Sequence, residues 1–160
     1  MSEIFAVRGP SISYREFIAL INENALKDAD GAPEDGTQLL SDARCFYIDE
    51  VSCRGVEFLW RKGVYTITIN KPSAPEDWQL GLHITKALAR YFGAKIEAEN
   101  EKLSLERFSS TYDDSWVKKC FDADFDMILD HTSQLGGGLT ITMDCALRPF
   151  TWDPVSLVRS

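Results

Sequence analysis

The segment 55–70 constrains the fold of this chain more than any other part of the sequence. Two runs rich in β-branched and aromatic residues, 55–61 and 64–70, are separated only by Lys62 and Gly63. A two-residue connection that contains glycine is typical of an antiparallel β-hairpin, whereas parallel strands need a crossover of a dozen or more residues. In the second run apolar side chains alternate with threonines, as in a strand with one buried face. The sequence therefore predicts a hairpin within an antiparallel sheet.

The spacing of apolar residues predicts the other elements. Four further strands are predicted at 4–8, 43–49, 95–99 and 139–143. Three helices are predicted: one after Ser13 that extends to Ala25, one over 76–92 that ends at Gly93, and one that Asp113 or Asp114 caps and that extends to about His131. Ser13 and Glu16 have the spacing of a capping box. The loop 29–37 and the tail 148–160 are predicted to be irregular.

The order of these elements defines the expected fold class. The middle three strands follow one another along the chain, and one pair of them is a hairpin, which favours an α+β fold over a doubly wound parallel sheet. The length of 160 residues fits one ordinary domain. We therefore expect a single compact α+β domain over residues 1–160, with a mainly antiparallel sheet of five to six strands and three helices.

The net charge limits the classes of partner. Lysine and arginine total 17 against 25 aspartates and glutamates, so the formal charge is −8. This sign opposes binding to nucleic acid or to an anionic membrane surface, and it favours a basic protein partner. No apolar run is long enough to span a membrane, and Glu3 stands where a secretory signal would carry basic residues. We expect a soluble cytoplasmic protein.

The acidic residues are concentrated in one segment. Residues 28–50 hold seven acidic residues and the single base Arg44, and so carry six of the eight net negative charges. Dispersed charge would serve solubility as well, so this concentration predicts a surface that faces a basic partner, with a merely solvated loop as the alternative. The residues predicted to bind the partner in this segment are Asp30, Glu34, Asp35, Asp42, Asp49 and Glu50.

Two of the four tryptophans are further candidates for partner binding. Trp60 and Trp116 fit core faces of their elements. Trp78 follows a proline-containing loop at the start of a predicted helix, and Trp152 lies in the tail. Tryptophan is enriched at binding hot spots, so either residue is a candidate anchor, with packing at the edge of the core as the alternative.

No pattern of catalytic or metal-binding residues is complete. The four cysteines form no Cys-x-x-Cys pair and are interpreted as buried thiols of a reducing compartment. Asp122, Asp124 and Asp126 resemble the start of a calcium loop, but its sixth and twelfth positions hold Met127 and Ser133 instead of glycine and glutamate. Gly136–138, His83 and His131 belong to no known phosphate-binding or catalytic pattern. We expect neither a metal ion nor a cofactor.

Two stretches resemble a known class of proteins. Residues 77–92, which open with Asp-Trp-x-Leu-Gly, and the tail residues Arg148, Pro149 and Phe150 resemble small bacterial proteins, among them cytosolic immunity proteins encoded beside secreted toxins. The resemblance implies a non-enzymatic inhibitor that binds one toxin and blocks its active site. It assigns no site residues. The expected function is therefore that of an acidic immunity or inhibitor protein.

Two other classes of function remain open. A small enzyme would need a site that is assembled only in the fold, for example a histidine near a cysteine or several carboxylates. A subunit of a larger assembly or a homo-oligomer would need a large apolar interface.

Overall fold

The predicted hairpin is present in the structure, a computed structural model that describes residues 2–41, 43–52, 54–134, 141–143 and 150–152. Strands β4 (Val56–Arg61) and β5 (Val64–Asn70) pair antiparallel, with Glu57 opposite Thr68 and Trp60 opposite Tyr65. The connecting residues Lys62 and Gly63 both adopt positive φ, at 52° and 81°. Such angles are those of a primed turn, which matches the twist of the two strands.

The hairpin lies in the middle of a larger antiparallel sheet. β1 (Ser2–Arg8) pairs with β5 on one side and with β6 (Ile96–Ala98) on the other. The full order among the described residues is β2 (Leu26–Asp28), β3 (Arg44–Ile48), β4, β5, β1, β6 and β7 (Glu101–Leu103). β8 (Ile141–Met143) and β9 (Phe150–Trp152) form a separate two-stranded sheet. The α+β class is confirmed.

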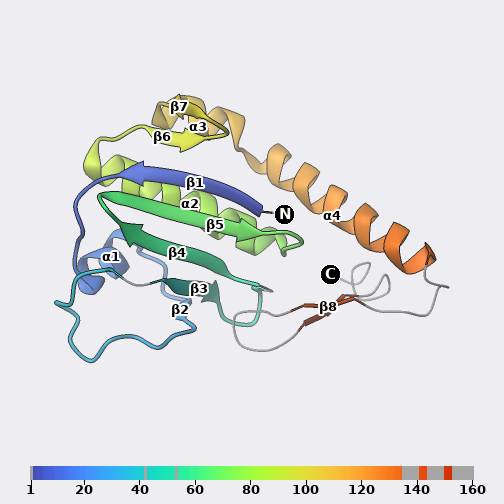
Figure 1. Cartoon of the computed structure of the whole chain (residues 1–160), viewed down its shortest axis with the longest axis horizontal. Helices are drawn as coiled ribbons and strands as arrows, with labels where there is room; N and C mark the ends of the chain where they lie inside the picture. The colour runs from blue at the N-terminus through green and yellow to red at the C-terminus, as the bar shows by residue number, and fades with distance from the viewer. Residues whose placement is uncertain (1, 42, 53, 135–140, 144–149, 153–160) are drawn as a thin grey trace.

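The described helices pack on one face of the seven-stranded sheet. α2 (Pro75–Phe92) crosses behind the strands in Figure 1 and contacts β1, β3, β4, β5 and β6. α1 (Tyr14–Ile21) packs beside it, and its Phe17 ring lies 4.7 Å from that of Phe58. α3 (Leu105–Thr111) and α4 (Asp114–Gln134) also contact α2, and Phe108 of α3 lies 5.1 Å from Phe5.

The period-two pattern of the strands therefore separates a covered face from an open face. On β5, Tyr65, Ile67 and Ile69 point to the helices and are fully buried. Thr66 and Thr68 point to the opposite side and are half-buried. The open face, as used below, consists of the side chains on that opposite side of the central strands, namely Ile4, Ala6, Cys45, Glu57, Leu59, Thr66 and Thr68.

Side-chain caps set the helix boundaries. Ser13 Oγ accepts a hydrogen bond from the Glu16 amide at 3.1 Å, which confirms the predicted N-cap of α1. Glu16 contacts the Ser13 hydroxyl rather than its amide, so the capping box is incomplete. α1 ends four residues before Ala25, because Asn22 adopts a left-handed conformation. Asp113 accepts from the Trp116 amide at 3.0 Å and so caps α4 as predicted.

The Asp-Trp-x-Leu-Gly stretch is a packing motif at the start of α2. Asp77 is fully buried, and its carboxylate accepts hydrogen bonds from the amides of Arg54, Gly55 and Ala74. Gly81 lies so close to the Ile69 side chain that a methyl group at this position would overlap it. The motif therefore fixes α2 against the sheet and against the turn before β4.

Several elements differ from the prediction. β2, β7 and α3 were not predicted, so the sheet has seven strands instead of five to six, and four helices are described instead of three. The tail is not wholly irregular, since it contains β9. Gly136–138 lies outside the described residues. Over the described part of the chain, no helix is both long and apolar enough to cross a lipid bilayer.

Candidate functional site

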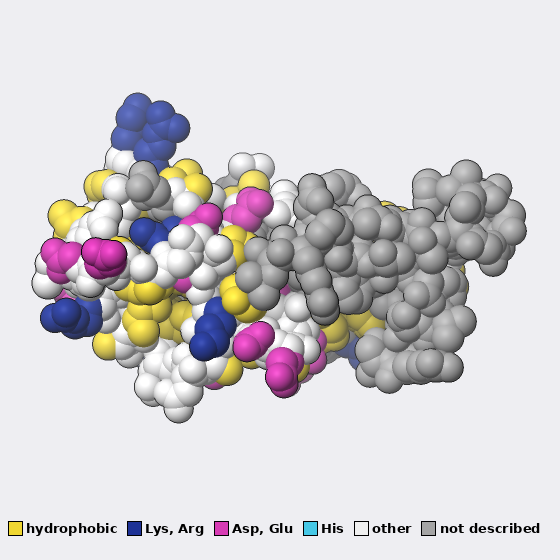
Figure 2. All heavy atoms as spheres, turned by 90° about the horizontal axis from the view of Figure 1, so that it is seen from below, with side chains coloured by type: hydrophobic (Ala, Val, Ile, Leu, Met, Phe, Trp, Pro, Cys, Tyr) yellow, Lys and Arg dark blue, Asp and Glu magenta, His cyan; other side chains and the backbone are white. Residues whose placement is uncertain are grey.

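Strand β3 divides the acidic segment 28–50 into two groups of carboxylates. Asp30, Glu34 and Asp35 lie in the loop before β3, and Asp49 and Glu50 lie in the turn after it. All five are exposed, whereas Asp42 lies outside the described residues. Figure 2 shows the molecule from below the view of Figure 1, with acidic side chains intermixed with apolar and basic ones on its described part. Within the segment, the described exposed acids are divided between the loop before β3 and the turn after it.

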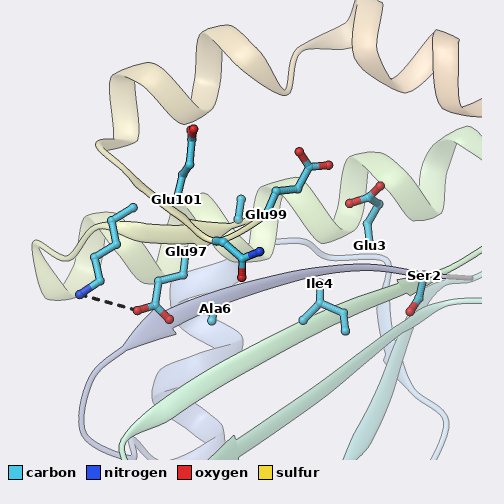
Figure 3. A pocket seen from close by; sticks show the side chains of 10 residues that line it. Ser2, Glu3, Ile4, Ala6, Glu97, Glu99 and Glu101 are labelled. Atoms are coloured by element: carbon cyan, nitrogen blue, oxygen red, sulfur yellow. Dashed lines mark ion pairs between the residues drawn. The ribbon is translucent and has the colours of Figure 1, made fainter.

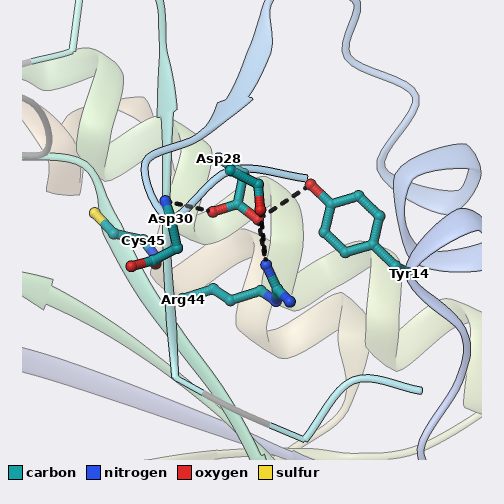
Figure 4. A network of polar contacts seen from close by, with 6 residues as sticks. Tyr14, Asp28, Asp30, Arg44 and Cys45 are labelled. Carbon is teal, nitrogen blue, oxygen red and sulfur yellow. Dashed lines mark hydrogen bonds and ion pairs between the residues drawn. The ribbon is translucent and has the colours of Figure 1, made fainter. Parts of the chain in front are cut away.

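A buried ion pair anchors the loop before β3 (Figure 4). Asp28, at the end of β2, has 2% of its side chain exposed and lies 2.7 Å from the Arg44 guanidinium. The same carboxylate accepts from the Tyr14 hydroxyl at 3.1 Å and from the Asp30 amide at 2.9 Å. Burial and the neighbouring Asp28 carboxylate raise the pKa of Tyr14 to about 12, so this phenol stays a donor. The network, here called the loop anchor, joins α1, β2 and β3.

The acidic residues of the loop differ in the hydrogen bonds that their carboxylates accept from the chain. Asp30 accepts from the Cys45 amide at 3.1 Å, and Asp35 accepts from the amide and hydroxyl of Thr37. These hydrogen bonds lower the pKa of Asp35. Glu34 has no hydrogen bond or ion pair to any described residue. Aspartates in such turns have a structural role of their own, which accounts for part of the acidic composition.

A hollow of about 390 Å³ lies on the open face next to this loop. Asp30 and Glu57 line it, together with Leu59 and the two threonines of β5. Glu57 is exposed and has no hydrogen-bond or ion-pair partner in the part of the chain that the structure describes. The pKa of Cys45, which also lines the hollow, is raised to about 12 by burial and by the carboxylates of Glu57 and Asp30. Two carboxylates and one guanidinium, that of Arg44, therefore line the hollow, and acidic side chains outnumber basic ones.

Sequence reasoning missed Glu57 although a signal for it was present. Glu57 alternates with the apolar residues Val56 and Phe58, which predicts that it points away from the core. Its position beside Asp30 depends on the pairing of Glu57 with Cys45 across β3 and β4. That register could not be read from the sequence.

A second hollow, of about 690 Å³, lies at β1, β6 and β7 (Figure 3). Ile4 and Ala6 form part of its wall, and Glu97, Glu99 and Glu101 contribute carboxylates. Glu97 is already neutralised by Arg8 at 3.2 Å and by Lys102 at 3.9 Å. Figure 3 shows the carboxylates of Glu99 and Glu101 pointing away from the sheet surface. This hollow is larger than the first, and two of its four carboxylates, those of Glu3 and Glu97, already pair with bases of the chain.

The structure corrects the prediction for Trp78. This side chain is fully buried, and its ring lies 5.3 Å from that of Trp116 in an edge-to-face contact. Helix α4 covers the start of α2, a contact between distant segments that the local sequence does not reveal. Trp78 is therefore a core residue and not a partner anchor. The side chain of Trp152 lies outside the described part of the chain.

The described cysteines and histidine do not form a nucleophilic pair. Burial raises the pKa of Cys120 to about 11, so both this thiol and that of Cys45 stay protonated at neutral pH. His83 Nε2 lies 2.7 Å from the carbonyl oxygen of Ile21. Among the described residues no three histidine, cysteine or acidic side chains are grouped as ligands for a metal ion. Cys53, Cys145 and the side chain of His131 lie outside the description.

One carboxylate of the predicted acidic helix face is buried. Asp124 is 4% exposed and accepts from the Ser73 amide at 3.3 Å, which links α4 to the loop before α2. Burial raises its pKa to about 6, against the opposing effects of the Ser73 amide and of Lys71. The indole N–H of Trp78 also favours the ionised form, although it does not reach hydrogen-bond geometry. Asp122, by contrast, is exposed and pairs with Lys118.

Comparison with known proteins identifies one family. A family model described as a domain of unknown function (DUF4299) matches residues 12–119. The match begins just before α1 and ends in the first turns of α4, so it includes the loop anchor, the hollow beside Asp30 and the packing motif of α2. No curated protein and no solved structure matches the chain.

Proposed function

Because the chain belongs to the DUF4299 family of domains of unknown function, its role has to follow from its own residues, and we propose that it is a non-enzymatic binding protein for a basic protein partner. The observation that carries this proposal is the acidic loop before β3. The loop exposes the carboxylates of Asp30, Glu34 and Asp35. It begins at the buried ion pair between Asp28 and Arg44.

The anchor matters because a fixed loop loses little conformational entropy on binding. Asp28 is held by three donors from three parts of the chain, so the start of the loop has a defined position before any partner arrives. Pre-organisation of this kind favours affinity, and surface carboxylates raise the rate of encounter with a basic surface. Both effects support a binding role for this surface.

Toxin neutralisation is the specific form of this proposal that the sequence resemblance implies. In that form the partner is a toxin, and the acidic loop covers a basic surface around its active site. The support is the match in charge sign. The residues predicted in the turn after β3, Asp49 and Glu50, would extend the contact along the sheet edge.

The test neutralises the loop without disturbing its hydrogen bonds. The triple variant Asp30→Asn, Glu34→Gln, Asp35→Asn keeps the acceptors for Cys45 and Thr37 and changes the net charge by three. A matched control, Glu99→Gln, Glu101→Gln, Glu106→Gln, makes the same change at exposed residues near β7, at the edge of the sheet opposite β2. The tagged full chain is used to isolate partners from its native cell, and each partner is then purified and measured by surface plasmon resonance.

We expect a basic partner whose association with the loop variant is at least about tenfold slower at low salt and less sensitive to salt, while the control variant behaves like the natural chain. A toxin partner would lose its toxicity in cells that express the natural chain. Equal association rates for the two triple variants would contradict the proposal. So would an acidic partner or self-association alone, the second of which would instead indicate a subunit of an assembly.

A further inference from the structure

The hollow beside the acidic loop has the chemistry of a pocket for one side chain. We infer that it receives a single arginine or lysine side chain of the partner, held between the carboxylates of Asp30 and Glu57. This inference rests on the proposed function and specifies which chemical group of the partner is recognised. It concerns a place on the open face that is distinct from the exposed carboxylates of Glu34 and Asp35.

The acceptors around the hollow match a cationic side chain. A guanidinium carries five N–H donors and an ammonium carries three, and neither has an acceptor. The hollow offers two carboxylates, together with Thr66 and Thr68. Leu59 provides an apolar wall for the aliphatic stem of a long basic side chain, whose charged end can then reach the carboxylates.

The negative charge of the hollow is not neutralised from within the described chain. Arg44 also borders the hollow, but its guanidinium is engaged by Asp28 at 2.7 Å, in the loop anchor. Glu57 has no ion-pair partner among the described residues. The two carboxylates and Asp28 also account for part of the raised pKa of Cys45. A cation that enters therefore meets a site where its charge is favoured.

The pocket is formed before binding. Its wall consists of neighbouring strands, with Glu57 paired to Cys45 on one side and to Thr68 on the other. Asp30 is fixed by two hydrogen bonds, one from its own amide to Asp28 and one from the Cys45 amide to its carboxylate. A ligand group that enters such a site orders few protein side chains, which favours even a small ligand.

The second hollow, at β1, β6 and β7, serves as an internal control. Glu97, one of its four acidic residues, already contacts Arg8 and Lys102, so a cation bound at this carboxylate would have to displace a base of the protein itself. Glu97 lies on the same side of the sheet as Glu57, because Ala6 pairs with both Thr66 and Glu97. The substitutions Glu57→Gln and Glu97→Gln therefore remove one carboxylate each from the same face.

The test uses small probes in place of the unidentified partner. N-acetyl-arginine amide, N-acetyl-lysine amide and the neutral isostere N-acetyl-citrulline amide are titrated into the ¹⁵N-labelled full chain and followed by NMR. We expect saturable shifts in the millimolar range at the amides of Cys45, Glu57, Thr66 and Thr68 for the two cationic probes, and none for citrulline. Glu57→Gln should weaken the binding by about fivefold or more, while Glu97→Gln leaves it unchanged.

Three results would contradict the inference. Saturation by citrulline as well, no saturable shifts with either cation, or equal binding by Glu57→Gln would overturn it. Glu57 is exposed, so its variant should fold, and an unchanged amide spectrum away from the hollow verifies this. If the cations fail to bind while loop neutralisation still slows association with the partner, the pocket is wrong and the proposed function stands. If the cations bind but neutralisation of the loop, which includes Asp30, leaves association with the partner unchanged, the hollow is a cation site that the partner does not use, and the proposed function is wrong.

Discussion

The two faces of the central sheet are built from the same strands, yet they differ in almost every physical respect. On β4 and β5, the covered face holds Phe58 and Tyr65, which are buried and in ring contact at 5.6 Å. The open face of the same two strands holds Glu57 and Thr68 as direct partners. The comparison shows that the covered face supplies the packing of the core, while the open face carries polar side chains that the core does not require.

The strongest challenge to this comparison is a pair of substitutions at adjacent positions. Phe58→Ala should lower the free energy of unfolding by about 3–5 kcal/mol, because it opens a cavity among aromatic rings. Leu59→Ala, one residue later on the open face, should cost about 1 kcal/mol or less, because its side chain is only half-buried. Urea denaturation followed by tryptophan fluorescence measures both. Equal losses would show that the open face is also part of the core.

Substitution in the loop anchor tests whether its polar groups contribute to the stability of the fold. Arg44→Met leaves the Asp28 carboxylate buried without its cation, and we expect a loss of about 3 kcal/mol in the free energy of unfolding. The control Arg61→Met removes an exposed arginine and should change stability by less than about 0.5 kcal/mol. Thermal denaturation of the two variants at one pH gives the comparison. If Arg44→Met left the stability unchanged, the fold would not depend on the loop anchor.

Asp124, on the covered side of the molecule, should make the free energy of unfolding depend on pH. Its pKa of about 6 in the folded state lies above the ordinary value of 3.8, so the folded protein keeps a proton that the unfolded chain releases. This stabilisation is complete below about pH 4 and is lost as the pH rises through 6, by on the order of 2 kcal/mol. Asp124→Asn should remove this slope from urea denaturation curves measured between pH 4 and 7. The exposed Asp122→Asn should keep the slope.

The smallest effect concerns the contact of α2 with the covered face. Gly81→Ala should lower stability by about 1 kcal/mol, because the overlap with Ile69 outweighs the better helix propensity of alanine. In an Ile69→Val background, which removes Cδ1 but keeps the second overlapping atom, Cγ1, the same change should cost less. A double-mutant cycle by chemical denaturation measures this coupling. Additive effects would show that the two residues do not press on each other.

Elements with a clear local pattern could be predicted from the sequence, whereas β2, β7 and α3, which lack one, could not. The hairpin 56–70 and the helices after Ser13 and Asp113 follow from alternation, turn residues and caps. β2 and β7 each contain a single apolar residue, so they show no period-two pattern, and they exist because β3 and β6 pair with them. The position of β1 in the sheet depends on partners far along the chain.

The candidate site divides in the same way. The exposure of Asp30, Glu34 and Asp35 follows from the composition of their loop. The site's hollow depends on the register of β3, β4 and β5, and for this reason Glu57 was missed. The error at Trp78 has a similar origin, since only the packing of α4 on α2 shows that the start of this helix is covered.

The central place of β1 has a consequence for the order in which the domain can assemble during synthesis. The ribosome produces this strand before either of its neighbours. β5 begins only at residue 64, and β6 begins only at residue 96. Until β5 is made, β1 lacks both of its neighbouring strands and also α2, the helix that packs against it. The domain therefore completes its sheet late in translation, and a nascent chain that ends before β5 presents an unpaired apolar strand to the chaperones that bind such segments.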